Sequence, residues 1–304
     1  MEEVLKLLPK ELVKEMEHFS QPLLNRIEEI RLRINRPVEM ISSGKSYLFS
    51  YRFSQNDRTQ LLNELSDYSF YTLEEELKRG YITVEGGHRV GLAGKVIIEK
   101  GQVKALRYIT SFNIRVARQK IGIANPLIPF LHERKWLNTL IVGPPQTGKT
   151  TLLRDIARFI SSGSSLISPS KVGIVDERSE IAGSVHGVPQ HCFGERIDVL
   201  DSCPKAEGMM MLIRSMSPDC IVVDEIGRKE DTEAMLEAVN TGVTIIVTAH
   251  GESIKDLMKR PTIRPLLDEK VFHRVVELSN RKGPGTIQQV MDSEGKSLSV
   301  MPRC

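Results

Sequence analysis

One short segment constrains this chain more than any other, because residues 143–151 carry the phosphate-binding (P-loop, Walker A) pattern GxxxxGK[ST]. It reads Gly143-Pro144-Pro145-Gln146-Thr147-Gly148-Lys149-Thr150-Thr151. The glycines allow the backbone to curl, so that consecutive N–H groups point at phosphate oxygens. Lys149 supplies a positive charge for the β and γ phosphates, Thr150 a hydroxyl ligand for Mg²⁺, and Thr151 a contact near the α phosphate. We therefore expect the whole segment to bind ATP or GTP together with Mg²⁺.

The surrounding residues have the order strand, loop, helix that this motif requires. Thr139–Val142 is an apolar strand, and Lys149–Ile160 is an amphipathic helix whose positive dipole end faces the loop. Short apolar runs alternate with helical stretches along this part of the chain, at 140–142, 172–175, 221–223, 244–247 and 275–278. Such runs are typical of strands buried on both faces of a parallel sheet. An α/β nucleotide-binding domain is thus predicted over residues 121–304.

The first 120 residues have a different pattern. Residues 2–18 and 58–80 have helical periodicity, and Ile30–Ile34 alternates strictly between apolar residues and arginine. Glycine-broken runs typical of strands follow, at 81–85, 88–98, 103–108 and 111–118. Pro126 and Pro129 then mark the change of pattern. The sequence predicts a smaller α+β N-terminal domain over residues 1–120.

Acidic residues end two of the predicted strands. Asp224-Glu225 follows the run at 221–223, and Asp176-Glu177 follows the run at 172–175. Strand ends on the P-loop side of a parallel sheet form the ligand crevice. Chain order favours Asp224 for the water shell of Mg²⁺ and Glu225 beside the γ phosphate, while Glu177 stays a candidate for orienting the attacking water.

His250 ends the fourth of these runs and is expected at the same edge of the sheet, where it can contact the γ phosphate. An ordinary capping or packing role is the alternative for this histidine.

Composition excludes several other kinds of protein. Lys and Arg number 42 against 39 Asp and Glu, the charges are interspersed, and aromatic residues make up 5%. This balance disfavours a nucleic-acid partner, because proteins that bind nucleic acids usually have a concentrated basic face and aromatic side chains that stack on bases. The four cysteines form no CxxC pair and fit a reducing compartment. No apolar run approaches the roughly 20 residues of a membrane span, so we expect a cytoplasmic protein that reaches any membrane through partners.

The motifs together resemble those of a known family. GPPQTGKTT, VDERSEIAG, RSMSPDCIVVDEIG and GVTIIVTAHG occur in the order seen in the type II/IV secretion and pilus-motor ATPases. The chain is most similar to one branch of that superfamily, the stage III sporulation AA family of endospore-forming bacteria. The segments that carry this closer resemblance are Glu29–Arg33, Arg36–Val38 and Asp198–Met211.

The resemblance implies a homo-hexameric ring ATPase, with an N-terminal domain hinged to a RecA-like P-loop motor domain. It implies a place in the mother-cell cytoplasm, where the ring powers a membrane-embedded channel complex around the forespore. It assigns Glu177 to the family's acidic box, Glu225 to the catalytic glutamate and His250 to the histidine box. One departure is Asp224, since the pilus motors usually have a glycine before that glutamate.

Two other kinds of function stay open at this level. RecA-like domains also drive nucleic-acid motors, and a nucleotide can serve only to control the assembly of a scaffold. The arginine that completes a neighbouring site is also undetermined among Arg107, Arg115, Arg118, Arg178, Arg196, Arg214 and Arg228. Met209, Met210 and Met211, with Leu212 and Ile213, are expected to form a buried helix face rather than a partner groove.

Overall fold

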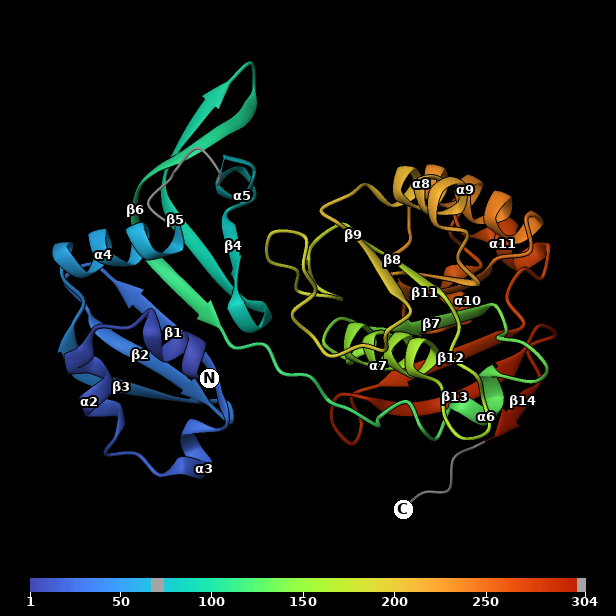
Figure 1. Ribbon diagram of the computed structural model, residues 1–304, viewed down its shortest axis with the longest axis horizontal. Coiled ribbons are helices and arrows are strands. Elements are labelled where there is room, and N and C mark those ends of the chain that lie inside the picture. Colours follow the sequence, from blue (N-terminus) through green and yellow to red (C-terminus); the bar gives the residue numbers. More distant parts are fainter. Residues whose placement is uncertain (67–73, 300–304) are drawn as a thin grey trace. The chain divides into compact units, whose positions relative to one another are not determined.

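The computed structural model describes residues 1–66 and 74–299, which fall into two compact units (Figure 1). The first is Met1–Arg118 and the second is Gln119–Cys304. Each unit has its own sheet and its own hydrophobic core. The change of unit lies two residues before the boundary expected from the sequence.

The first unit is built on a six-stranded antiparallel sheet with the order β3-β2-β1-β6-β5-β4. Its strands are β1 Ile27–Arg33, β2 Pro37–Ser42, β3 Lys45–Arg52, β4 Tyr81–Val84, β5 His88–Glu99 and β6 Gln102–Arg115. Its helices are α1 Glu2–Lys6, α2 Lys10–Met16, α3 Gln21–Leu24, α4 Gln55–Leu65 and α5 Glu74–Arg79.

Alternation in β1 produces one buried and one solvated face, as the sequence predicts. Ile30 and Leu32 are fully buried, whereas Arg31 and Arg33 lie on the other face. Each arginine forms an ion pair at 2.9 Å, with Glu29 or Glu39. The apolar side of the sheet therefore forms the core of this unit.

Three expectations for the first unit need correction. The helical stretch expected at 2–18 is two helices, α1 and α2, which are separated by residues 7–9. The helical stretch expected at 58–80 is two helices, since α4 ends at Leu65 and α5 begins at Glu74; residues 67–73 lie outside the described part. The two strands expected at 103–108 and 111–118 are one long strand, β6. Register between β5 and β6 shifts near Gly94, where a Cβ atom would lie 2.7 Å from the Tyr108 carbonyl oxygen, so glycine permits the close approach.

The second unit has an eight-stranded sheet with the order β14-β13-β12-β7-β11-β10-β8-β9. Strands β12 through β9 in this order are parallel, and β13 and β14 add an antiparallel edge. The strands are β7 Thr139–Gly143, β8 Val172–Asp176, β9 Ile197–Asp201, β10 Cys220–Val223, β11 Thr244–His250, β12 Arg274–Ser279, β13 Thr286–Asp292 and β14 Ser297–Ser299. The helices are α6 Ile128–Leu131, α7 Lys149–Ser162, α8 Lys205–Met216, α9 Lys229–Asn240, α10 Ile254–Leu257 and α11 Arg264–Asp268.

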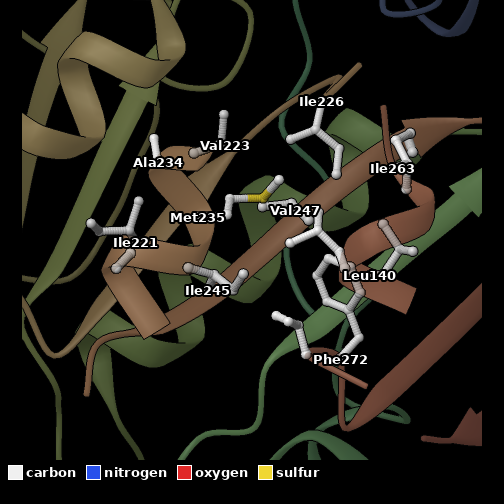
Figure 2. Packing of buried hydrophobic residues seen from close by; sticks show 14 of the residues in the cluster. Leu140, Ile221, Val223, Ile226, Ala234, Met235, Ile245, Val247, Ile263 and Phe272 are labelled. Carbon is white, nitrogen blue, oxygen red and sulfur yellow. The ribbon is translucent and has the colours of Figure 1, made fainter. Parts of the chain in front are cut away.

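Helices cover both faces of the parallel strands. On one face α8, α9, α10 and α11 pack against a cluster that includes Leu140, Met235 and Val247, which Figure 2 shows together. On the other face α6 and α7 pack against a cluster that includes Ile141 and Ile156. Because successive residues of a strand point to opposite faces, continuous apolar runs fill both clusters.

All five apolar runs are strands, as predicted, but the sequence did not predict β9. Its residues Ile197–Asp201 include two aspartates, Asp198 and Asp201, among three apolar side chains, and they pair in parallel with β8 at the edge of the sheet. Over residues 1–66 and 74–299, no helix combines the length and apolarity that crossing a bilayer requires.

Candidate active site

The phosphate loop joins β7 to α7 in a closed conformation. Gly148, the residue before α7, has φ of 82°, and Gln146 has φ of 62°, so two residues of the loop lie in the left-handed region. The buried Thr147 hydroxyl donates to the Pro144 carbonyl at 2.7 Å across the loop. The backbone carbonyl of Thr147 accepts a hydrogen bond of 2.8 Å from the N–H of Gly285, which lies in the loop between β12 and β13. The loop is thus held from inside and from a neighbouring hairpin.

Lys149 lies inside this loop, and its ammonium group has three partners. It donates to the carbonyls of Gly143 at 2.7 Å and Pro144 at 2.8 Å, and its Nζ lies 3.1 Å from Nδ1 of His250. Because an ammonium group can only donate, Nδ1 accepts and the proton of a neutral His250 is on Nε2. That Nε2 lies 2.6 Å from Glu225 and therefore donates to it. His250 thus links the P-loop lysine to Glu225.

The charge state of Lys149 reflects its surroundings. Burial lowers the pKa of its ammonium, and the carboxylates of Asp224 and Glu225 oppose that shift.

Thr151 follows in the first turn of α7 and is half-exposed, whereas Pro145 and Gln146 are exposed at the tip of the loop. The backbone of residues 143–148 and the head of α7 therefore present N–H groups and one cation to the same space.

Asp224 joins the P-loop to two other strands. The Thr150 hydroxyl donates to its Oδ2 at 2.6 Å, and the Thr248 hydroxyl donates to its Oδ1. Burial raises the pKa of Asp224, and these two hydrogen bonds oppose the shift. A hydroxyl and a carboxylate at this distance are the hard oxygen donors that Mg²⁺ prefers, so this pair fits the predicted metal.

Glu225 has an unusual backbone conformation for a glutamate. Its φ is 54°, and a left-handed conformation at a residue with a side chain costs of order 1 kcal/mol. Its N–H donates to the Thr248 hydroxyl at 2.8 Å, which helps to hold this conformation. Its carboxylate contacts His250 on one oxygen and Arg178 on the other, at 2.6 and 2.9 Å. The sequence predicted that Glu225 and His250 share one edge of the sheet, and the two are in contact there.

The two residues of the other acidic pair, Asp176 and Glu177, have different surroundings. Asp176 is buried and accepts three backbone N–H groups, from Glu180, Ile181 and Ala182, at 2.8–2.9 Å. Burial raises its pKa to about 6, although the hydrogen bonds oppose this. Asp176 therefore shapes the loop that follows β8, and it also lines the pocket that contains Glu177 and Asp224.

Glu177 faces the same pocket as Glu225, and Asp224, Arg178 and Lys205 also line it. Its carboxylate forms a 2.5 Å ion pair with Lys205 and lies 3.8 Å from Arg228. Burial raises the pKa of Glu177, but the pair with Lys205 and the charges of Arg228 and Arg178 together lower the net pKa. Both glutamates therefore lie at the edge that holds Thr150 and Asp224.

Several contributors were not predicted from the sequence. Thr248 joins the ends of β10 and β11 through its hydroxyl; a polar residue at a strand end beside the acidic strand is the signal that could have found it. Arg154 is buried in α7 and donates to the carbonyls of Glu180 and Ile181, both at 2.6 Å. Among the candidate arginines, Arg178 lies at the site of its own chain.

Comparison with known proteins adds a family to this geometry. Over residues 1–298 the chain matches the family described as "Sporulation stage III, protein AA". Stage III sporulation protein AA of Bacillus subtilis (strain 168) is 59% identical over 299 residues, which cover 98% of this chain and 97% of that protein.

Two solved structures are similar in fold. The ATPase DotB of Legionella pneumophila has a TM-score of 0.59 at 17% identity, covering 89% of this chain and 76% of that one. The pilus retraction motor PilT, solved with bound ADP, has a TM-score of 0.60 at 16% identity, covering 88% and 76%. These likenesses confirm the predicted fold, a RecA-like α/β domain preceded by a smaller α+β unit.

Proposed function

Since the chain belongs to the sporulation stage III protein AA family, we propose that it is a Mg²⁺-dependent ATPase of the secretion-motor type. The observation that carries this proposal is the 2.6 Å hydrogen bond between Thr150 of the P-loop and Asp224, which follows β10. It joins the two elements that a P-loop NTPase needs for nucleotide and metal. The similar fold of PilT, a motor solved with ADP, supports the same proposal.

In this proposal the P-loop residues 143–151 bind the phosphates. Lys149 exchanges its contacts with the carbonyls of Gly143 and Pro144 for phosphate oxygens, and the backbone N–H groups surround the β phosphate. Thr150 and, through water, Asp224 hold Mg²⁺, which supplies neutralising charge for the β and γ phosphates.

Hydrolysis requires a group that orients and polarises the attacking water. Glu225 has that role, because its carboxylate lies beside the Lys149–His250 contact where the γ phosphate is expected. His250 senses the γ phosphate, because Lys149 leaves Nδ1 of the imidazole when it turns to the phosphate, while Nε2 can still donate to Glu225. Glu177 supports the same water or the water shell of the metal.

On the scale of the cell, we place the protein in the mother cell as a homo-hexamer. There it would energise the assembly of, or transport through, a channel between the mother cell and the forespore. Its partners in this role are membrane-embedded channel proteins, and the protein reaches the membrane through them. The sporulation name of the Bacillus subtilis relative supports this assignment.

The test combines phosphate release with mass measured by light scattering, each with and without Mg·ATP. We expect Mg²⁺-dependent release and a hexamer favoured by ATP. Lys149→Ala removes the charge that neutralises the β and γ phosphates and should lower release by about a hundredfold or more. Lys229→Ala, an exposed lysine on α9, is the control and should release phosphate like the parent. Normal release by a folded Lys149→Ala protein would contradict the proposal.

The same measurements separate the alternative functions. Slow turnover that does not change when the ring forms would favour an assembly scaffold. Stimulation by single-stranded DNA would favour a nucleic-acid motor. Parallel assays with GTP decide which nucleotide is preferred.

A further inference from the structure

A groove runs between α8 and α9, which lie side by side on one face of the eight-stranded sheet (Figure 1). Its volume is about 740 Å³. Each helix contributes one stripe of side chains with the spacing i, i+3, i+4, i+7, the spacing of one helical face. The stripes are Glu207, Met210, Met211 and Arg214 on α8, and Glu230, Glu233, Ala234 and Glu237 on α9.

The floor of the groove is apolar. Met211 is 52% exposed, Met210 is half-buried, and Ala206 and Ala234 leave room beside them. The buried helix face expected for the methionines is correct for Met209, which is fully buried, and wrong for Met211. Exposed methionines suit adaptable apolar contacts, because the side chain is unbranched and polarizable.

The rim of the groove is acidic. Four carboxylates line it, those of Glu207, Glu230, Glu233 and Glu237, against the single guanidinium of Arg214. The lining therefore carries −4 + 1 = −3, whereas the whole chain carries +3. Glu233 also forms an ion pair of 3.2 Å with Lys229. This sign selects a cationic ligand.

We propose that this groove binds a basic amphipathic helix of a partner protein. Two parallel-running stripes with helical spacing leave the position of a third helix open, and an apolar face with i, i+3, i+4, i+7 anchors fits the methionine floor. Lysines or arginines flanking that face meet the four carboxylates. The site is separate from the P-loop residues, so it stands whether or not the chain hydrolyses ATP.

Within the residues that the structure describes, a second copy of this chain has no helix of this kind to offer. Across residues 1–66 and 74–299, α7 is the one helix with two more cations than anions. Its apolar side chains, among them Leu152, Leu153 and Ile156, are buried against the sheet. The remaining helices are short, neutral or acidic, or belong to the groove itself. The ligand helix therefore comes from another protein.

The test uses the full chain and a fluorescent peptide of about 14 residues, made of leucine and lysine with leucines at helical i, i+3, i+4, i+7 spacing. Its length matches the 12-residue helices α8 and α9. Anisotropy should show saturable binding that weakens between about 50 and 300 mM NaCl. The same peptide with glutamate in place of lysine should not bind.

Two matched protein variants locate the site. Glu230→Lys/Glu237→Lys should weaken binding by about tenfold or more, because two attractive contacts become repulsive. Glu195→Lys/Glu269→Lys makes the same change of net charge at exposed positions outside the groove and should bind like the parent. Met211→Ser leaves the charge unchanged and should weaken binding several-fold by removing apolar contact.

Three results would overturn the proposal, provided that circular dichroism shows folded variants. One is the absence of saturable binding to the parent protein. Another is an equal loss in both lysine pairs, which indicates attraction by net charge alone. The third is a change in oligomeric mass caused by Glu230→Lys/Glu237→Lys without peptide, which assigns the groove to contacts between copies of this chain.

Discussion

At the scale of single residues, the two glutamates of the site have different partners, and the difference predicts different roles. Glu225 contacts the imidazole of His250 and an exposed Arg178, whereas Glu177 forms an ion pair with Lys205. A carboxylate that already has a lysine at 2.5 Å is less able to polarise water than one whose main donor is an imidazole. The partners therefore favour Glu225 as the group that acts on water.

We predict that Glu225→Gln separates binding from chemistry. The amide keeps the shape of the carboxylate but cannot polarise water, while Thr150, Asp224 and the P-loop amides are unchanged. ATP affinity should stay near that of the parent, phosphate release should fall by about a hundredfold or more, and an ATP-bound oligomer should accumulate. Nucleotide titration, phosphate release and light scattering measure the three effects.

Glu177→Gln is the comparison for that experiment. If Glu177→Gln binds ATP but does not hydrolyse it, while Glu225→Gln hydrolyses ATP normally, the base is Glu177 at the end of β8. The assignment of Glu225 as the catalytic glutamate is then wrong. If both variants are inert, the two acids act as a unit, and their separate contributions cannot be divided.

Asp176 gives a prediction about stability and pH. Burial raises its pKa from an ordinary 3.8 to about 6 in the folded protein, so the folded state holds this proton more tightly than the unfolded state. Stability from this group is thus present below about pH 4 and is lost as pH rises towards 6, by about 3 kcal/mol in total.

Asp176→Asn removes that titration. The free energy of unfolding of the parent minus that of the variant should decrease as pH rises from about 4 to about 7, measured by urea unfolding at several pH values. A difference that stays constant across this range would contradict the role of burial at Asp176.

Sequence reasoning at this scale identified side chains better than contacts. It placed Thr150 with Asp224 because metal ligands in this motif are defined by residue type and strand order. It did not predict the chain of contacts from Lys149 through His250 to Glu225, since that depends on side-chain rotamers. It paired Asp176 with Glu177 as acids, but it could not show that the backbone N–H groups of residues 180–182 occupy the carboxylate of Asp176.

At the scale of elements, Thr248 holds two strand ends in a fixed relation. Its hydroxyl accepts the Glu225 N–H after β10 and donates to Asp224, while Thr248 itself belongs to β11. We predict that Thr248→Val loses about 1–3 kcal/mol of stability, because it leaves the Glu225 N–H without its partner. Phosphate release should also fall by about tenfold, because Asp224 and Glu225 are no longer held in place.

A control at the other end of the same strand separates the two effects. The Thr244 hydroxyl donates to the Trp136 carbonyl at 3.2 Å, far along β11 from the acids. Thr244→Val should lose stability in urea unfolding but keep the parent's phosphate release per folded molecule. Equal loss of release in both variants would mean that Thr248 acts only through general stability.

Element prediction succeeded where one signal was strong. Apolar runs identified β7, β8, β10, β11 and β12, since strands buried on both faces have few polar residues. The sequence contains no such signal for β9, an edge strand with Asp198 and Asp201 among its five residues. It also could not show that α8 buries Met209 but exposes Met211, because that depends on where α9 packs.

At the scale of the whole molecule, the cores of the two units share no residue. Every buried residue of the N-terminal cluster lies between Val4 and Ile114, and every buried residue of the other two clusters lies between Ala124 and Met291. The change of pattern near Pro126 lies close to this division, and the two domains 1–120 and 121–304 stay a prediction. The order of strands in the second sheet needed the structure, since the chain order of the strands alone fits several sheets.

The last prediction follows from these separate cores. The fragment Gln119–Cys304 retains both apolar clusters of the eight-stranded sheet, the P-loop, both acidic strand ends and His250, so it should fold by itself. Thermal unfolding followed by circular dichroism should show one cooperative transition. We expect ring formation to help close the nucleotide site, so the fragment should bind ATP but release phosphate at least about tenfold more slowly than the full chain. Light scattering at equal concentration should show a loss of the ATP-dependent oligomer.

Full activity in the fragment would mean that Met1–Arg118 serves only as an adaptor. A fragment without a cooperative transition would contradict the independence of the two cores.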